Sequence, residues 1–559
     1  MEPERRVRLV GADDASHRAE PVQYGHELPE LQGERDPVEE QDSLIVLRDL
    51  RGAVHDPDVD GDVVLQRSRP TLPDPALCII RHVPDSKARC ALPRTAPHPE
   101  GSDRYMTRPE SAGHGREHGR EHGPEHGPEH GHGDDREGAL AYDVVVSGAS
   151  LAGSAAAILL ARRGVRVALL ERRSDPEAYK VLCTHSITAN AYPVLDELGL
   201  VPAIEKAGAV RNEARWYTRW GWIEPRAAPG GPELPYAYNI RRSTLDPMIR
   251  SLAGRTPGVD LLLGHQVTGL VREAGRTVGV RASTPRGERE IRARLVVGAD
   301  GKDSAVAKLA GVPGREYQNG RFGYFAHFRD LPLRGGLGHT WFLDPDMAYA
   351  FPNEDGVTVI AVLPGKKWLP AFREDLEGSF LAFVRALPEA PPIDSAERTT
   401  KITGTVNYPL HSRRPTAPGV ALVGDAALTG DPLWGVGCGW ALESAGWLAE
   451  AVAPAATGRG DLDQSLTAYE RRHRRALRGH QYLAADFAKA RPFNPVERLM
   501  FSAAARDASL ARHMHLFGSR LIGPLRFLNP VAVAKAAAVN IRHRRAAAPP
   551  PVHLSRTRS

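Results

Sequence analysis

Cysteine is scarce in this chain of 559 residues. Only four are present, Cys78, Cys90, Cys183 and Cys438, and no two have C-x-x-C spacing. This pattern excludes a disulfide framework and a Cys-type zinc site, so we expect no bound metal. Isolated thiols suit a reducing compartment, and a cytoplasmic location is the expectation.

Long hydrophobic runs are also lacking. No stretch of about 18 uninterrupted apolar residues occurs, and the first residues lack the apolar segment of a secretion signal. We therefore expect neither a transmembrane segment nor secretion. The net charge of +5, from 73 basic and 68 acidic side chains, is too small to indicate a nucleic-acid partner. The oligomeric state stays open.

Aromatic residues are nearly absent before residue 140, where Pro, Arg, Asp and His recur without apolar periodicity. We predict that residues 1–140 are disordered, because they cannot bury a core. A four-residue repeat runs through residues 116–131. Its histidines either bind nickel or zinc weakly, or the repeat is a solvated low-complexity tract. Met106 is an alternative initiator. The histidines of this tract are His114, His118, His122, His126, His130 and His132.

From Tyr142 the pattern becomes periodic. Residues 142–147 (YDVVVS) predict a short buried strand, and 151–163 (LAGSAAAILLARR) predict a helix that ends at Gly164. The next apolar run, VRVALLE, predicts a second strand. Strand, turn, helix and strand within about 30 residues indicate a βαβ unit with a right-handed crossover and a parallel sheet.

The turn in this unit has the pattern G-x-S-x-x-G, formed by Gly148, Ser150 and Gly153, and Glu171 ends the second strand. Such a turn binds dinucleotides: Gly148 permits the bend, a small residue at 150 lets backbone amides approach a pyrophosphate, and Gly153 lets helix and strand touch. Glu171 would accept hydrogen bonds from ribose hydroxyls. The alternative is an ordinary glycine turn of an α/β protein.

Two later segments also place glycines and a carboxylate at the carboxyl end of a predicted strand. One strand ends in Gly298-Ala-Asp300-Gly301, with Asp303 or Ser304 as a helix cap, and another ends in Gly424-Asp425. The second continues through Asp431-Pro432 to a helix start rich in glycine, at Gly435, Gly437 and Gly439. In this order the three motifs resemble the aromatic-hydroxylase and geranylgeranyl-reductase group of FAD-dependent enzymes, over about residues 141–455.

That resemblance implies FAD as the cofactor. Asp425 would bind its ribityl or ribose part, and Asp300 would lie near the pyrophosphate. The helix from Gly435 would direct its N-terminal amides at the flavin pyrimidine edge, where negative charge develops on reduction. The full predicted cofactor set is Gly148, Ser150, Gly153, Glu171, Arg242, Asp300, Gly301, Gly424, Asp425, Pro432, Gly435 and Gly437.

Residues 238–250 (YNIRRSTLDPMIR) resemble the group's R-x-x-L-D signature. Arg242 would point to the cofactor, or Asp246 would hold the helix. Because two arginines are adjacent, Arg241 is an alternative to Arg242, and a charged surface helix is a further one.

Residues 180–200 resemble the group's segment beside the flavin, which makes Cys183, Thr184 and His185 candidates for the active-site wall. His185 is the predicted catalytic residue, because a histidine can transfer protons near neutral pH. A hydrogen-bonded structural histidine is the alternative. Cys183 is more simply a small buried hydrophobe.

The substrate side is predicted from strands. Phe322, Tyr324, Ala326 and Phe328 alternate on one face of a strand, and residues 347–363 form a hairpin with a connection at 353–356. The group's antiparallel substrate domain would present an apolar, aromatic face to the flavin, although core packing explains the same alternation. The segment Trp220-Gly-Trp222 resembles a halogenase motif incompletely, and we assign it to a strand near the substrate or domain boundary.

The predicted fold class is therefore α/β, with a Rossmann-like FAD-binding domain, an inserted antiparallel substrate domain and a C-terminal helical region. The predicted parts are an FAD-binding domain within 141–455 (about 141–205, 236–330 and 410–455), a substrate domain (about 206–235 and 320–410), helices at 456–541, and disordered tails at 1–140 and 542–559.

The resemblance implies an NAD(P)H-dependent monooxygenase, in which NAD(P)H reduces FAD and O2 supplies an oxygen atom to a hydrophobic aromatic or polyene small molecule. Two alternatives remain. One is carbon-carbon double-bond reduction, as in geranylgeranyl reductases, whose Y-x-W-x-F-P strand is partly matched by residues 347–352. The other is a flavin-binding protein without turnover.

Overall fold

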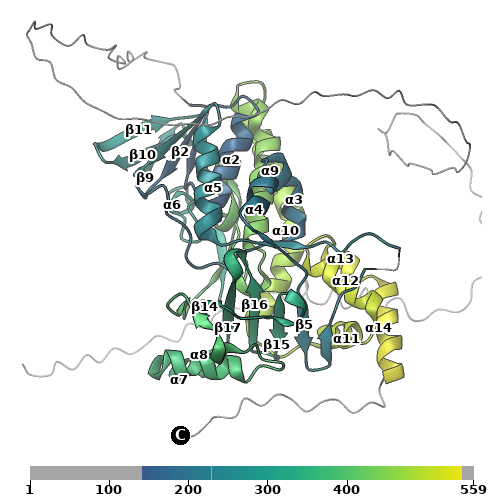
Figure 1. Cartoon of the computed structure of the whole chain (residues 1–559). Coiled ribbons are helices and arrows are strands. Elements are labelled where there is room, and N and C mark those ends of the chain that lie inside the picture. The colour runs from purple at the N-terminus through teal and green to yellow at the C-terminus, as the bar shows by residue number, and fades with distance from the viewer. Residues whose placement is uncertain (1–141, 228–229, 544–559) are drawn as a thin grey trace, which may run out of the picture. The chain divides into compact units, whose positions relative to one another are not determined.

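The chain is described from a computed structural model, which covers residues 142–227 and 230–543 (Figure 1). The predicted disordered segment 1–140, its histidine tract and Met106 lie outside these residues. So does most of the predicted tail at 542–559. Helix α14 (Pro530–His543) includes residues 542 and 543, so the helical region extends past its predicted end at 541.

A six-stranded sheet forms the centre of the first part. Its strands are short and rich in Val, Leu and Ala, and the central ones are buried on both faces, as expected for a parallel sheet. All neighbours pair in parallel except the edge pair β21–β22. In spatial order the strands are β21 (Thr416–Ala417), β22 (Val420–Leu422), β12 (Leu295–Gly298), β1 (Val144–Ser147), β2 (Val167–Glu171) and β8 (Val259–Leu263).

Different layers cover the two faces of this sheet. Val144 and Val146 of β1 pack with helices α2 (Leu151–Ala161), α5 (Arg242–Arg255) and α9 (Gly437–Ala456), which lie together in Figure 1. Val145 points the other way, into a core shared with a three-stranded antiparallel sheet. That sheet consists of β9 (Gln266–Glu273), β10 (Arg276–Thr284) and β11 (Gly287–Arg292).

The larger sheet has eight strands and is antiparallel apart from the pair β5–β15. The predicted hairpin is confirmed: β16 pairs with β17 from Met347↔Leu363 to Pro352↔Thr358, and residues 353–356 connect them. The tryptophan segment forms the β5–β6 hairpin at the edge. The strands are β18 (Glu397–Arg398), β14 (Gly323–Arg329), β17 (Val357–Leu363), β16 (Met347–Pro352), β15 (His339–Phe342), β5 (Arg215–Thr218) and β6 (Gly221–Ile223), with β19 (Thr403–Thr405) also on β14.

The alternating face of β14 is not the flavin-facing wall that its pattern suggested. Phe322, Ala326 and Phe328 are buried with Phe372 and Phe380 of helices α7 (Leu369–Glu374) and α8 (Leu376–Arg385). Phe325 and His327 occupy the opposite face. An alternating strand has two faces, and period-two alternation does not say which one a helix will cover.

The remaining short elements connect these layers. They are the sheet of β3 (Ser186–Ile187), β7 (Ala237–Asn239) and β4 (Val210–Asn212), the pair β13 (Gly314–Tyr317) and β20 (Leu410–Arg413), the helices α3 (Tyr192–Glu197), α4 (Val201–Lys206) and α6 (Ala305–Leu309), and the 3-10 turns η1 (Ala189–Ala191), η2 (Arg334–Gly336), η3 (Glu354–Gly356), η4 (Lys366–Trp368), η5 (Ile393–Ser395), η6 (Gly424–Ala426) and η7 (Pro432–Trp434).

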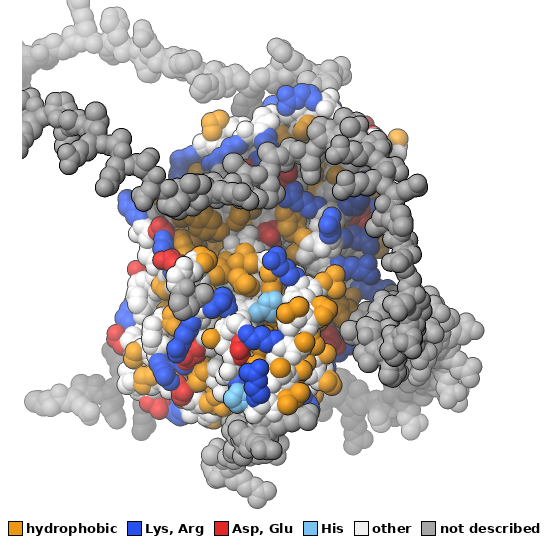
Figure 2. All heavy atoms as spheres, turned by 90° about the vertical axis from the view of Figure 1, so that its right-hand side faces the viewer, with side chains coloured by type: hydrophobic (Ala, Val, Ile, Leu, Met, Phe, Trp, Pro, Cys, Tyr) orange, Lys and Arg blue, Asp and Glu red, His pale blue; other side chains and the backbone are white. Residues whose placement is uncertain are grey.

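The C-terminal region is helical, as predicted. The helices are α10 (Leu462–Ala488), α11 (Pro495–Ala504), α12 (Ala508–Gly518), α13 (Pro524–Phe527) and α14. The last helices, α11 to α14, lie toward the right-hand side of Figure 1, which Figure 2 turns to the viewer, whereas α10 runs through the middle. Of the helices in the described ranges, none is long and apolar enough to cross a membrane. The fold class is thus confirmed, whereas the detailed domain boundaries stay a prediction.

Candidate functional site

The predicted cofactor motifs converge at one edge of the parallel sheet. Gly148, Glu171, Asp300 and Gly424 lie at or just beyond the carboxyl ends of β1, β2, β12 and β22. These four strands run in parallel, so their carboxyl ends share one side. Open α/β sheets bind ligands at this edge.

The first glycine turn is tightly closed. The Gly148 amide donates to the Leu170 carbonyl oxygen at 2.7 Å, and Gly148 has φ of +103°. A Cβ at Gly153 would lie 1.8 Å from the Gly148 carbonyl oxygen, so only glycine fits. Ser150 is the N-cap residue of α2, but its side chain makes no capping hydrogen bond. The first amides of α2 are therefore left for another acceptor.

The carboxylates of the first two motifs bind local backbone. Glu171 accepts from the Ala149 amide at 3.0 Å and from the Arg173 amide at 3.2 Å, so it braces the glycine turn. Asp300 accepts from Ser304 Oγ at 2.5 Å and from the Val306 amide at 3.1 Å. Ser304 is the residue that caps α6. Their contacts with a cofactor stay a prediction.

Helix α9 also begins without a side-chain cap. Its N-cap residue is Val436, which has no side-chain acceptor, and Gly437 starts the helix. A Cβ at Gly437 would meet no atom within 4 Å, whereas Gly435 has φ of +63° and needs glycine for its backbone. Pro432 and Trp434 form the turn η7 just before it, and the buried Trp434 indole nitrogen has no hydrogen-bond partner among the described residues. An uncapped helix start beside open space suits an anionic or polar ligand.

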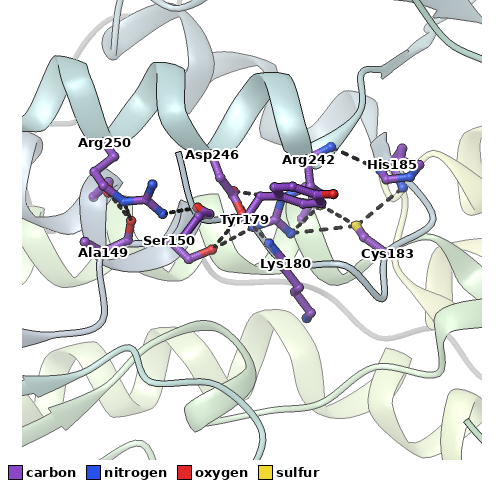
Figure 3. A network of polar contacts seen from close by, with 12 residues as sticks. Ala149, Ser150, Tyr179, Lys180, Cys183, His185, Arg242, Asp246 and Arg250 are labelled. Atoms are coloured by element: carbon purple, nitrogen blue, oxygen red, sulfur yellow. Dashed lines mark hydrogen bonds and ion pairs between the residues drawn. The ribbon is translucent and has the colours of Figure 1, made fainter. Parts of the chain in front are cut away.

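Helix α5 contributes a buried ion pair to the first turn (Figure 3). Arg242 binds Asp246 through Nε at 2.8 Å and Nη2 at 2.6 Å, and Nη2 also donates to Ser150 Oγ at 2.7 Å. Arg241 turns away, to Glu354 and Asp355. The structure therefore resolves the two-arginine ambiguity: Arg242 faces the glycine turn, and Asp246 fixes it there.

Asp425 is tied to the loop that follows β2. Its Oδ2 accepts from Lys180 Nζ at 2.6 Å, and 15% of its side chain is exposed. The Asp425 carboxylate raises the pKa of Lys180. The Lys180 backbone amide donates to Asp246 Oδ2 at 2.9 Å, so Lys180 links the buried ion pair of α5 to the third motif.

Two cysteines lie beside Arg242. The Cys183 and Cys438 sulfur atoms are 3.8 Å apart, and Arg242 Nη1 lies 3.7 Å and 3.9 Å from them. The hydrogen bond from Cys438 and the Arg242 charge lower the pKa of the Cys183 thiol, although its burial opposes them. Cys183 therefore has polar partners, and it also packs against the hydrophobic core, as expected of a small hydrophobe.

His185 starts a directed chain of hydrogen bonds. The Arg242 backbone amide can only donate, and it meets His185 Nδ1 at 3.2 Å. The proton of a neutral His185 is therefore on Nε2, which lies 2.9 Å from His327 Nε2. His327 then carries its proton on Nδ1, 3.3 Å from the exposed Thr400 Oγ1. Burial and the neighbouring His185 lower the pKa of His327 to about 4, so His327 is neutral near pH 7.

Sequence reasoning missed Lys180, His327 and Arg250. Arg250 donates to the carbonyls of Ala149 and Ala178, at 3.0 Å and 2.7 Å, and so holds both loops of the site. A signal for it existed, because Arg242, Asp246 and Arg250 recur every four residues and share one helix face. His327 and Lys180 gave no local signal, since their partners lie far away in the sequence.

The residues fit FAD on three observations. Two helices begin uncapped at the carboxyl edge of the sheet. Open space surrounds Gly437. Carboxylates that could accept from hydroxyl groups, Glu171 and Asp425, end two of the motifs. In the part of the chain that the structure describes, no group of three or more His, Cys, Asp or Glu side chains could hold a metal ion.

Asp425→Ala is expected to lower FAD affinity by roughly 10- to 150-fold, equivalent to about 1.5–3 kcal/mol for a lost charged acceptor. Flavin absorbance of the purified protein measures occupancy. Asp303→Ala is the control, because Asp303 binds the adjacent Lys302. Lys180→Met removes the ion pair with Asp425 but keeps the Asp425 carboxylate. This variant should therefore retain more FAD than Asp425→Ala. Wild-type occupancy in Asp425→Ala would contradict the assignment.

Comparisons with known proteins agree with this geometry. A model of the family described as "FAD binding domain" matches residues 141–482. A kynurenine 3-monooxygenase of Salinispora arenicola is 30% identical over 403 residues, 66% of this chain and 84% of that protein. A digeranylgeranylglycerophospholipid reductase of Thermoplasma volcanium is 24% identical over 340 residues, 59% of this chain and 82% of that protein. A flavoprotein/dehydrogenase structure from Cytophaga hutchinsonii superposes with a TM-score of 0.60 at 18% identity, covering 72% of this chain and all of that one.

Proposed function

The chain belongs to the FAD-binding-domain family of FAD-dependent oxidoreductases, and from that premise we propose that it is an NAD(P)H-dependent monooxygenase. Its substrate is a hydrophobic aromatic or polyene small molecule, and the protein acts in the cytoplasm. When bound, FAD accepts two electrons from NAD(P)H and activates O2. The resemblance to the kynurenine 3-monooxygenase extends over more residues than that to the reductase, which favours oxygen insertion.

The observation that carries this proposal is the buried aromatic cluster beside the start of α9. Phe342 of β15 lies 5.9 Å from Trp434, ring centre to ring centre, and Trp434 immediately precedes Gly435. Tyr349 stacks on Phe351 at 4.8 Å in the same apolar cluster. A flavin held at Gly435 and Gly437 would thus have an apolar neighbour. Exclusion of water protects reactive oxygen chemistry, and apolar walls suit an aromatic or polyene substrate.

His185 and His327 supply the polar element near this cluster, since the His327 ring lies 5.9 Å from that of Phe325, which packs against the cluster. Arg242 fixes the tautomer of His185, and the chain through His327 ends at Thr400 on the surface. The Arg242 amide occupies His185 Nδ1 and cannot accept a proton, so His185 exchanges protons only through Nε2. His327 can accept a proton at one nitrogen and release one at the other, and it therefore connects His185 Nε2 with Thr400 at the surface. In this proposal His185 exchanges a proton with the substrate through Nε2, and His327 relays it to and from solvent.

His327→Phe is expected to lower turnover by roughly 10²- to 10⁴-fold, the usual contribution of a proton-transfer group. FAD occupancy should not change, because His327 lies on β14 of the eight-stranded sheet, away from the glycine motifs of the parallel sheet. Steady-state turnover and flavin absorbance measure the two effects. His265→Gln is the control, since the His265 imidazole hydrogen-bonds the Leu263 carbonyl oxygen two residues away, at 2.7 Å. Wild-type turnover in His327→Phe would refute the relay.

A double-bond reductase is the second candidate, and the digeranylgeranylglycerophospholipid reductases among the relatives favour it. The strand resembling their motif is β16, in which Tyr349 and Phe351 are buried. The two functions differ in their need for oxygen. Substrate-dependent O2 consumption with NADH or NADPH is expected of the monooxygenase, whereas conversion under strict anaerobiosis by the photoreduced protein would favour the reductase.

A further inference from the structure

The C-terminal helices expose large hydrophobic side chains where a soluble surface normally has few. Leu525 in the short helix α13 is 92% exposed, and Val531 in the first turn of α14 is 78% exposed. Leu521, Leu528 and Ile541 are also exposed. Four of these five residues fall within 11 positions, 521–531, so they form one cluster at a turn between helices, not scattered single residues.

The same segment contains no acidic residue. From 508 to the end of the sequence there is no Asp or Glu, whereas Arg and Lys recur. Arg526 and Arg542 are exposed, and neither forms an ion pair with any residue in 142–227 or 230–543. Lys535 pairs with Asp507, the last acid before the segment. The exposed apolar residues are therefore accompanied by basic side chains and by no acidic ones in this segment.

Helix α10 extends this positive surface. Arg471, Arg475 and Arg478 are exposed and recur with Tyr482 every three or four residues, so they share one helix face. Tyr482 is itself 71% exposed. The backbone at Gly479 packs on Pro524 at the start of α13, because a Cβ built there would lie 3.2 Å from Pro524 Cγ. Figure 2 shows hydrophobic and basic side chains interspersed over this side of the molecule.

We propose that this C-terminal surface binds an anionic lipid bilayer. Leucine and valine side chains that protrude from a turn can enter the interfacial region, while arginines beside them bind lipid phosphates. A stable protein interface needs roughly 20–30 residues on each side, far more than this cluster offers. A bilayer surface needs no matched shape. The protein would bind peripherally, whichever reaction its flavin site performs.

The test is co-sedimentation of the full chain with vesicles of phosphatidylglycerol and phosphatidylcholine, compared with phosphatidylcholine alone. Binding is expected only to the anionic vesicles and should weaken with salt. The double variant Leu525→Ser/Val531→Ser should weaken binding at least about tenfold, because both side chains lose their apolar contact with lipid. Arg526→Gln should weaken it by roughly fivefold.

Leu309→Ser and Arg286→Gln are the matched controls, since both residues are exposed outside the C-terminal region. They should bind vesicles as the wild type does, and circular dichroism should show all variants folded. Absence of binding to anionic vesicles, or undiminished binding by Leu525→Ser/Val531→Ser, would overturn the proposal. A change of that variant from dimer to monomer in light scattering, with vesicle binding intact, would instead show an interface between two copies.

Discussion

Gly153→Val is expected to abolish FAD binding and to lower the melting temperature of the chain substantially. Gly153 is the second residue after the uncapped start of α2, and a Cβ there would overlap the Gly148 carbonyl oxygen at 1.8 Å. The atom it meets is backbone, which cannot rotate away, so the turn must open. Opening the turn moves the amides that the dinucleotide requires. Flavin absorbance and a thermal melt of the same sample measure both effects.

Gly254→Ala is the matched control for that variant. Gly254 is also inside a helix, but the nearest atom to a Cβ there is a Leu261 side-chain methyl at 3.2 Å, which can shift. Alanine also favours the helix by about 1 kcal/mol. This variant should bind FAD as the wild type does. Retention of flavin by Gly153→Val would contradict the predicted role of the first turn.

Asp246→Leu is expected to destabilise the protein by about 3–5 kcal/mol, because it leaves Arg242 charged and buried without its partner. The side chains of Arg242 and Asp246 are 5% and 0% exposed. Asp246 also accepts from Ser150 Oγ and the Lys180 amide, so its loss frees both loops of the site. Chemical denaturation with an extrapolated unfolding free energy measures the change.

The double variant Arg242→Met/Asp246→Leu separates stability from cofactor binding. Replacing a buried ion pair by apolar side chains often restores stability, so the double variant should be more stable than Asp246→Leu alone. It should still bind FAD poorly, because Ser150 and the loop at Lys180 lose their fixed partners. If the double variant is no more stable than the single one, the pair is not the source of the effect.

Local patterns predicted most of what lies within one motif. The βαβ unit from Tyr142 to Glu171 was predicted, since strand and helix periodicities and the glycine turn are all encoded within about 30 residues. The hairpin at 347–363 and the glycine-rich start of α9 follow from equally local signals, although the helix begins at Gly437, two residues after the predicted start at Gly435. The sequence left Asp303 and Ser304 as alternative caps of α6. The structure shows that Ser304 is the cap, since its side chain accepts from the Ala307 amide.

Contacts between distant segments could not be predicted in this way. Lys180 meets Asp425 across 245 residues, and His185 meets His327 across 142. No spacing in the sequence encodes either pair, because both depend on how the sheets come together. For the same reason the sequence left open whether Phe322 and Phe328 face the flavin or a core, and they pack in the core against α7 and α8, which follow by more than 35 residues.

We propose that the flavin site inserts one atom of O2 into its substrate, and isotope labelling is the decisive measurement. The product of a reaction under ¹⁸O2, with NAD(P)H as the reductant, is analysed by mass spectrometry. One heavy oxygen atom is expected in each product molecule. Conversion by the photoreduced protein without oxygen, with two hydrogens gained and no ¹⁸O label under ¹⁸O2, would contradict it.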